Sequence, residues 1–528
     1  MDPFLTRIDT VDLAIIGLYL LIVFAIGAYL ARRTHDADDL FLAGRRLGWL
    51  PVGLSLFASN ISSTTLIGLM GAAYIWGIAV ANYEWMAAPL LVVFAIILIP
   101  LYLRARIGTV PEYLERRFDG RARRYFSALT LVSNILVDTA GSLFAGAIVL
   151  SAFVPGLDLF TAALILAAVA GIYTAAGGLA AVVYTDVLQA VILLVGASLV
   201  TFFSFQAIDF DWGRVVEATD PQQLSLFLPM SDPNLPWLGV VVGVPVLGFY
   251  FWCANQFVVQ RVLGARDIEN ARWGALLAGF LKLSVIFIMV IPGVIAIQII
   301  PGLEQADQVF PSLIAELLPV GLRGIVLAAL VAALMSSVDS TLNSAATLLT
   351  LDFIKPLRPN LTPRQTAWIG RIAILFFMLI SAAVAPWIGS FEGLFHYLQT
   401  ALSYLVPPVA ALFLLGALWA RPGPRAALAT LLGGHAVSAV LFALTLGGVL
   451  NLHFTLVAGI LFALSASIFV VVGLLEPRPS AARAIASREM VWHPALARPT
   501  RAGAWWSDYR LQSAILLALT AALAIGFR

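Results

Sequence analysis

The sequence predicts an all-α polytopic membrane protein with about fourteen transmembrane helices. Of its 528 residues, 61% are hydrophobic and only 11% are charged, whereas a soluble domain is about 25% charged. Apolar runs of about 20 residues, the length that crosses a bilayer as a helix, recur along the whole chain. The single cysteine, Cys253, excludes an internal disulfide framework. We therefore expect the lipid bilayer as its surroundings, no nucleic-acid partner and no obligatory protein partner.

The apolar runs follow one another with short connections. The first run lacks a preceding basic stretch and exceeds the ~7–15-residue core of a signal peptide, so we expect it to remain as a span. The longest connections, about 205–237 and 477–507, are too short for a catalytic domain, so we do not expect an enzyme. The expected spans lie near 11–30, 50–75, 84–103, 126–152, 159–176, 180–204, 238–259, 273–300, 322–352, 367–386, 394–418, 426–449, 453–476 and 508–526.

The arginines predict the orientation of these spans. The connections after spans one, three, seven, nine, eleven and thirteen hold nearly all of them, with Arg117 after the third and Arg261 and Arg272 after the seventh. The opposite connections are acidic or nearly uncharged. Because arginine-rich loops stay in the cytoplasm, we predict a multi-pass protein of the plasma (inner) membrane with both termini on the outer side.

The second run, Leu50 to Tyr74, is interrupted at its middle by polar residues from Ser59 to Thr65, with Gly68 and Gly71 following. A helix broken at the bilayer midplane frees carbonyls that can coordinate a small cation. The alternative is a polar seam of small residues that packs against neighbouring helices. Both interpretations are consistent with this run.

A second run with helix-weakening residues appears five spans later, from Leu238 to Val259. It contains Gly243, Pro245 and Gly248. Two such runs at matching places in two five-span blocks favour a 5+5 inverted repeat. The expected division is a leading helix and loop at 1–48, a first repeat at 49–204, an outer loop at 205–237, a second repeat at 238–418 and three further helices at 419–528.

Two oppositely charged residues lie within or at the ends of the expected spans. Such residues are rare and are functional hypotheses by default. Glu84 opens the third span, where it is either an interfacial charge or a hydrogen-bond acceptor for a polar substrate. Lys282, one of two lysines in the chain, either extends its ammonium to the membrane surface or faces a cavity as a donor.

The ninth span combines a carboxylate with several hydroxyls. Asp339 lies among Ser336, Ser337 and Ser340, and a carboxylate in this setting is expected to neutralise or to find a cation. Hydroxyls and carbonyls are also the ligands that a hard cation requires. Close helix packing is the simpler explanation of the serines. Further polar candidates are Asp186 in the sixth span, Asp138 in the fourth and Gln399 in the eleventh.

Eight stretches of the chain carry a family resemblance: FLAGRRLGW, SLFASNI, PEYLERRF, YTAAGGLAAVVYTDVLQ, NQFVVQR, FLKL, LMSSVDSTLNSAATL and YLQTALSYLVPP. They run from about residue 41 to 415 and resemble the sodium/solute symporter family, in particular its sodium–glucose cotransporter branch. The resemblance implies fourteen spans around an amino acid/sodium symporter-like 5+5 core with one leading helix. It also implies that sodium is co-transported.

The resemblance further implies two cation sites. The first would use the backbone carbonyls of Ala58 and Ile61, the carbonyl of Ala333, and the hydroxyls of Ser336 and Ser337. A second site, found in some members of the family, would lie at Asp186 with Ser337, Asp339 and Ser340.

The substrate positions of the branch map onto Asn60, Glu84, Lys282 and Gln399, with an aromatic gate at Phe251 beside Trp252. This chain also departs from the branch. Thr65 stands where sugar-transporting relatives carry a longer polar side chain, Gly248 and Ala87 replace side chains that form hydrogen bonds in some relatives, and the gate is phenylalanine rather than tyrosine.

These residues together predict a sodium-coupled symporter that imports a small neutral polyhydroxylated solute, most simply a hexose, by alternating access. The same fold could carry a polyol such as inositol, or an amino acid, a carboxylate or choline. A membrane sensor with a transporter fold, a passive channel and an intramembrane enzyme are the alternatives from other classes.

Overall fold

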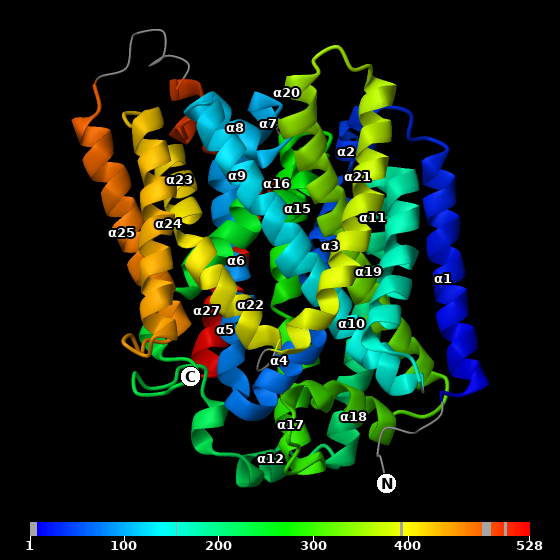
Figure 1. The fold of residues 1–528 in the computed structure, drawn as a ribbon. Helices are drawn as coiled ribbons and strands as arrows, with labels where there is room; N and C mark the ends of the chain where they lie inside the picture. The colour runs from blue at the N-terminus through cyan, green and yellow to red at the C-terminus, as the bar shows by residue number, and fades with distance from the viewer. Residues whose placement is uncertain (1–7, 155, 391–393, 478–486, 501–503) are drawn as a thin grey trace.

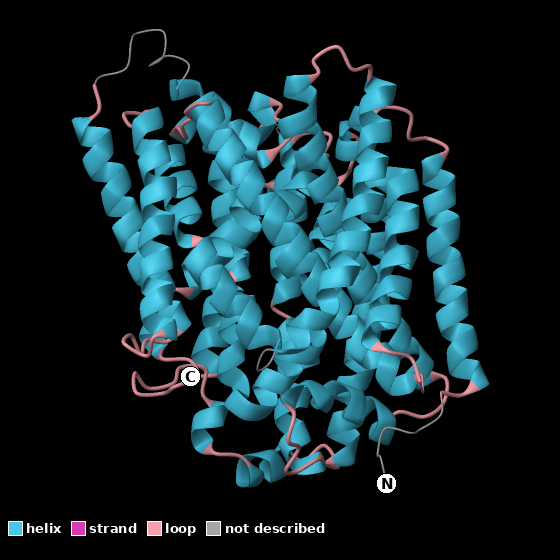
Figure 2. Ribbon diagram, in the orientation of Figure 1, coloured by secondary structure: helices cyan, strands magenta, loops and turns pink. Residues whose placement is uncertain are grey.

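The computed structural model describes residues 8–154, 156–390, 394–477, 487–500 and 504–528, which form a bundle of helices joined by short loops (Figures 1 and 2). The helices of the first half, in chain order, are α1 (Thr10–Ala31), α2 (Ala37–Leu42), α3 (Trp49–Asn60), α4 (Ser63–Trp76), α5 (Ala81–Trp85), α6 (Ala87–Val93), α7 (Ile99–Ala105), α8 (Val110–Arg117), α9 (Gly120–Ser133), α10 (Ala140–Phe153) and α11 (Leu159–Ala207).

The second half continues the bundle. Its helices are α12 (Trp212–Ala218), α13 (Trp237–Val242), α14 (Val244–Phe249), α15 (Gln256–Leu263), α16 (Ile268–Lys282), α17 (Ile291–Ile299), α18 (Val309–Leu317), α19 (Leu322–Leu348), α20 (Lys355–Leu357), α21 (Pro363–Val384), α22 (Leu394–Leu405), α23 (Pro407–Leu418), α24 (Pro424–Leu446), α25 (Phe454–Leu475) and α27 (Tyr509–Gly526).

Among the described residues, 11 helical segments are long and apolar enough to cross a membrane, or 12 when the bent pair α22 and α23 is included. The all-α, multi-pass prediction is therefore confirmed. All fourteen expected runs fall on helices, but two of them join within α11, a segment of 49 residues. The segment Ser63–Ala105 likewise joins the later half of the second expected span to the third over 43 residues. Each joined segment counts once by length and composition, so the count of segments is lower than fourteen.

The most enclosed segment is the one that begins with α19. In the most apolar stretch of 18 residues within Leu322–Leu357, 89% of the stretch is buried inside the bundle. The corresponding share for α1 is 17%. The helix α19 packs against α11, α21 and α3. The polar residues of the ninth expected span therefore lie at the centre of the bundle, and α1 lies at its edge, beside α11 (Figure 1).

The second expected span is broken where the polar residues predicted an interruption. The helix α3 ends at Asn60, and α4 begins at Ser63. Between them Ile61 has φ −91° and ψ 82°, and Ser62 is extended. The Ser62 hydroxyl accepts a hydrogen bond from the Thr65 amide at 3.1 Å and so caps α4.

The run from Leu238 to Val259 is also broken, but the main break lies later than its glycines and proline suggested. Asn255 is extended, with φ −71° and ψ 126°, and its side chain accepts from the Phe257 amide to cap α15. Gly243 keeps helical angles, and Pro245 occupies the first turn of α14, where its missing amide hydrogen is tolerated. The asparagine therefore breaks this span through its capping bond.

Three arginines that the sequence placed in cytoplasmic loops are buried instead. Arg117, Arg261 and Arg272 expose 3%, 1% and 0% of their surface. Their guanidinium groups donate to backbone carbonyls, as Arg117 does to Gly416 at 2.9 Å. Carbonyls near a helix end have no partner within the helix, so a guanidinium is stabilised there without reaching water. These three arginines lie on α8, α15 and α16 rather than in exposed loops, and their burial was not predicted from the sequence.

A reversal inside α11 separates the fifth and sixth expected spans. Gly178 has φ 59° and ψ −154°, angles that are accessible essentially to glycine alone. A Cβ atom at this position would lie 2.4 Å from the Leu40 carbonyl oxygen. The chain therefore requires glycine both for the backbone angles and for the close approach of the α2 segment.

We predict that Gly178→Ala destabilises the protein. Backbone strain alone contributes about 1–3 kcal/mol, and the contact with Leu40 adds to it. Thermal unfolding of the purified protein in detergent measures the effect as a lowered midpoint. The matched control is Gly17→Ala in α1, where a Cβ atom meets nothing within 4 Å. Equal midpoints for Gly178→Ala and wild type would contradict the proposed strain.

Candidate functional site

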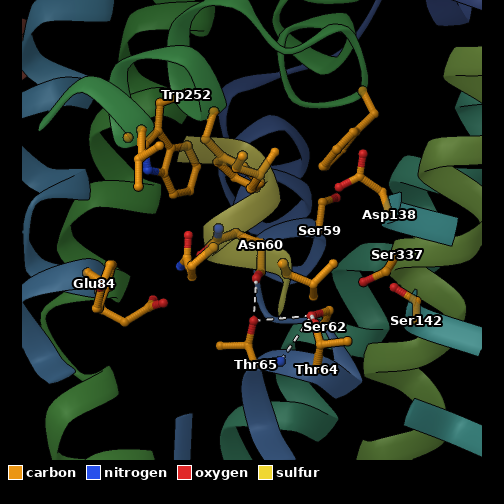
Figure 3. Close-up of a pocket in the computed structure, with 18 of the residues that line it drawn as sticks. Ser59, Asn60, Ser62, Thr64, Thr65, Glu84, Asp138, Ser142, Trp252 and Ser337 are labelled. Atoms are coloured by element: carbon orange, nitrogen blue, oxygen red, sulfur yellow. Dashed lines mark hydrogen bonds between the residues drawn. The ribbon is translucent and has the colours of Figure 1, made fainter. Parts of the chain in front are cut away.

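A cavity lies at the break between α3 and α4 (Figure 3), with about 160 Å³ open to the centres of water molecules. It is enclosed by residues of α3, α4, α5, α10, α14, α15, α19 and α22, and of two π-helical turns, Asn134–Thr139 and Tyr250–Ala254. Such turns are rare and are frequent at functional sites. The lining includes Asn60, Thr65, Glu84, Phe251, Trp252 and Gln399, which are six of the seven residues predicted to bind substrate.

The broken helix supplies the polar floor of the cavity. The Thr65 hydroxyl donates to the Asn60 carbonyl at 3.1 Å and also contacts the Ser62 hydroxyl at 3.1 Å. The Asn60 side-chain oxygen is buried and has no hydrogen-bond partner among the described residues. An unpaired buried acceptor is costly, so a donor from a bound solute would stabilise this position.

Aromatic side chains form the opposite wall. Phe251 and Trp252 follow each other in the π-helical turn, with ring centroids 5.2 Å apart, and Phe251 lies 5.6 Å from the ring of Phe257. Leu247 and Gly248 continue this wall. The cavity therefore offers an apolar surface on one side and hydrogen-bonding groups on the other.

Lys282 does not line the cavity, although the sequence placed it among the substrate ligands. It is completely buried, and its ammonium forms an ion pair with the Glu84 carboxylate from behind the cavity wall. Its nitrogen also lies 5.9 Å from the ring centroid of Trp252. Lys282 therefore balances the charge of Glu84 and orients it, and Glu84 presents the polar edge of the pair to the cavity.

We predict that Lys282→Met strongly destabilises the protein. Removing one partner of a buried ion pair leaves an uncompensated charge, at a cost of about 3–5 kcal/mol. The double variant Glu84→Gln/Lys282→Met, which removes both charges, should recover most of the lost thermal stability. A double variant as unstable as Lys282→Met alone would show that the pair does not set this stability.

One wall of the cavity carries Asp138, a carboxylate that the sequence analysis did not assign to the site. Asp138, Ser142 and Ser337 line the cavity opposite Glu84 (Figure 3), and Thr341 also lines it. Asp138 lies in the π-helical turn Asn134–Thr139. The signal for Asp138 was a carboxylate within an apolar run, but no partner for it could be identified from the sequence. Its position adds a hydrogen-bond acceptor to the cavity.

A buried ionic network lies beside the cavity on α3, α11, α15 and α19. Asp186 accepts hydrogen bonds from Ser55 and Ser336, both at 2.5 Å, and from the Arg261 guanidinium at 3.2 Å. Arg261 also donates to Ser55 at 2.9 Å and to Ser340. Arg261 is the participant that sequence reasoning missed, because it follows an apolar run by two residues and resembles a loop arginine.

Asp339 is linked to this network through Ser340, whose hydroxyl lies 3.1 Å from its carboxylate. The Tyr173 hydroxyl donates to the other oxygen of Asp339. Two carboxylates and one guanidinium thus share a buried region, because Asp186, Asp339 and Arg261 are all at most 1% exposed.

The residues predicted for the first sodium site belong to the end of α3 and to α19, which pack against each other. Ala58 lies in the last turn of α3 and Ile61 directly follows that helix, where helix geometry leaves carbonyls without partners. The Ser337 hydroxyl donates to the Ala333 carbonyl at 3.1 Å and lines the cavity. Ser336 points instead to Asp186.

A broken helix beside a polar cavity, within a bundle of apolar helices, is the arrangement of secondary transporters. Residues 40–434 of the sequence match the family model of the sodium:solute symporter family. The chain belongs to the sodium:solute symporter family. It is a sodium-coupled symporter and not an enzyme, as the sequence predicted.

Known proteins that resemble this chain agree with the assignment. Sodium/glucose cotransporter 4 of Danio rerio is 34% identical over 471 residues, which are 82% of this chain and 72% of the relative. The sodium/myo-inositol cotransporter of Homo sapiens is 34% identical over 534 residues, 90% of this chain and 74% of the relative. A solved sodium-coupled sialic acid symporter matches with a TM-score of 0.79 at 23% identity, over 89% of this chain and 99% of the other, and supports the fold.

Proposed function

We propose that this protein imports a small neutral polyhydroxylated solute, a hexose or a polyol, driven by the inward flow of sodium. The observation that carries the proposal is the cavity at the α3–α4 break. Its polar side presents Asn60, Glu84 and Gln399, and its apolar side presents Phe251 and Trp252. A sugar ring or cyclic polyol has hydroxyls for the first side and a C–H face for the second. The glucose and myo-inositol relatives support this substrate class.

The charge of the cavity favours a neutral solute. Glu84 is balanced by Lys282, so the pair presents hydrogen-bonding edges with little net charge. Asp138 remains as a further acceptor on the opposite wall. This arrangement disfavours an anionic carboxylate, which would face two acidic side chains. Choline and amino acids are the remaining rivals within the family.

We place the coupled sodium ion between the end of α3 and α19, at the carbonyls of Ala58, Ile61 and Ala333 and the hydroxyls of Ser336 and Ser337. Oxygen ligands of this kind suit a hard cation. Because Ser337 also lines the cavity, an ion at this site would act on the solute through shared residues. Sodium would then tighten solute binding, and the solute would tighten sodium binding by the same factor.

A second cation would bind near Asp186, Asp339 and Ser340. Two carboxylates face one guanidinium in this region, which leaves one negative charge to balance when both are ionised. Arg261 already occupies the Asp186 side, so the cation would lie toward Asp339.

We also propose fourteen spans in a 5+5 inverted repeat, with repeats at 49–204 and 238–418. Each proposed repeat begins with a broken helix, at Ile61–Ser62 and at Asn255. The first span, α1, begins and α27 ends at the same end of the bundle (Figure 1). This supports termini on one side, and the positive-inside rule places that side outside.

We predict that Ser337→Ala raises the sodium concentration for half-maximal uptake about tenfold, which corresponds to about 1.4 kcal/mol. The change removes one hydroxyl ligand from the proposed ion site. Sodium titration of uptake in proteoliposomes measures the shift. The matched control is Ser513→Ala in α27, a buried serine with the same bond to a carbonyl one turn earlier. An unchanged sodium dependence in Ser337→Ala would remove this residue from the site.

We predict that proteoliposomes containing the protein accumulate one labelled hexose or polyol only under an inward sodium gradient. The panel includes glucose, galactose, myo-inositol, an amino acid and choline. Accumulation of choline or the amino acid instead would contradict the proposed substrate class but would still agree with sodium-coupled symport. Uptake that equilibrates without accumulation would indicate a channel, and sodium binding without any uptake would favour a sensor.

A further inference from the structure

A second cavity, which we call the α1 groove, lies between α1, the α2 segment and α11 and shares no lining residue with the substrate cavity. It has about 750 Å³ open to the centres of water molecules and is lined by residues from Ile22 to Leu47 together with Ala180 and Tyr184. Nothing in the symport mechanism uses this space. It lies on the outer surface of the bundle, where α1 stands beside α11 (Figure 1).

The lower part of the α1 groove is apolar and faces the membrane. It is lined by Ile22, Ala25, Ile26 and Tyr29 of α1 and by Tyr184 of α11. Ile22, Tyr29 and Tyr184 expose 41%, 55% and 43% of their surface. An apolar surface of this kind within the membrane suits a hydrocarbon chain.

The upper part of the α1 groove is basic. Arg33 and Arg46 line it and are exposed, and among the described residues neither forms an ion pair with an acidic side chain. The neighbouring Arg45 differs, because it donates to the Arg106 and Ile107 carbonyls at 3.2 and 3.0 Å. The guanidinium of Arg33 lies 4.6 Å from the ring centroid of Tyr29, which holds it at the junction of the two parts.

One carboxylate, Asp39, also lines the basic part. It accepts a hydrogen bond from the His35 amide at 3.3 Å and so stabilises the turn before α2. Two guanidinium groups against one carboxylate leave a positive charge for a ligand. Basic pockets between membrane helices at the cytoplasmic side bind anionic lipid head groups.

The length of the α1 groove matches one leaflet. The 10 residues from Ile22 to the end of α1 at Ala31 span roughly 15 Å at about 1.5 Å per residue, with Arg33 two residues beyond, and half of the bilayer hydrocarbon is about 15 Å thick. We propose that the α1 groove binds one anionic phospholipid, with its phosphate between Arg33 and Arg46 and an acyl chain along α1. This inference does not depend on the identity of the transported solute.

Native mass spectrometry of the full-length protein tests the proposal, with phosphatidylglycerol and phosphatidylcholine of equal chain length added in turn. We expect the wild type to retain phosphatidylglycerol at several-fold higher occupancy. Arg33→Gln/Arg46→Gln should lower that occupancy to the phosphatidylcholine level. The control Arg358→Gln/Arg364→Gln removes the same charge from two exposed arginines, one directly after α20 and one in the first turn of α21, and should leave the occupancy unchanged.

A second variant tests the acyl-chain part separately. Ala25→Trp fills the apolar end without changing charge and should lower retention of both lipids. Equal retention of the two lipids by the wild type, or full retention by Arg33→Gln/Arg46→Gln, would overturn the proposal. Inorganic phosphate is the last arm: if it displaces phosphatidylglycerol with the same dependence on the two arginines, the site takes a free anion and the lipid assignment is wrong.

Discussion

The structure depends on a buried ionic network in which Asp186 of α11 holds Arg261 of α15. Ser55 of α3 and Ser336 of α19 donate to the same carboxylate. The network therefore joins both broken helices to the two long helices at the centre of the bundle. Loss of either charged partner would leave a buried charge without compensation, at a cost of about 3–5 kcal/mol. Because the breaks expose polar backbone at membrane depth, their positions must be held by protein contacts of this kind.

The chemistry of the substrate cavity follows from this constraint. Once the ends of α3 and α15 are held, the α3–α4 break presents Asn60 and Thr65 to the space that Phe251 and Trp252 close from the other side. A charged acceptor within the membrane also requires a partner of opposite charge. Lys282 provides that partner for Glu84. The Glu84 carboxylate is thereby available to a solute while its charge retains a partner, which suits a neutral ligand better than an ionic one.

The two breaks and the cavity residues illustrate what could be predicted. Polar residues in an apolar run located the α3–α4 break, because capping side chains such as Ser62 act on their immediate neighbours in sequence. The second break was placed in the correct run, but glycine and proline were less informative than the capping asparagine Asn255. Lys282 was recognised as unusual, yet its position behind Glu84 could not be predicted, because the two residues are 198 positions apart in the chain.

The sequence by itself determined the class of fold, the approximate spans and the membership in a sodium-coupled family, because hydropathy and local motifs are properties of short segments. Only the tertiary structure decided which polar side chains meet. It buried Arg261 against Asp186 and placed Asp138 in the cavity wall. It also brought Arg33, after α1, and Arg46, after α2, into one groove, where neither forms an ion pair within the described part of the chain. The physical reason is that a charge in the membrane must be paired or solvated, and its partner is chosen by packing between helices that are distant in sequence.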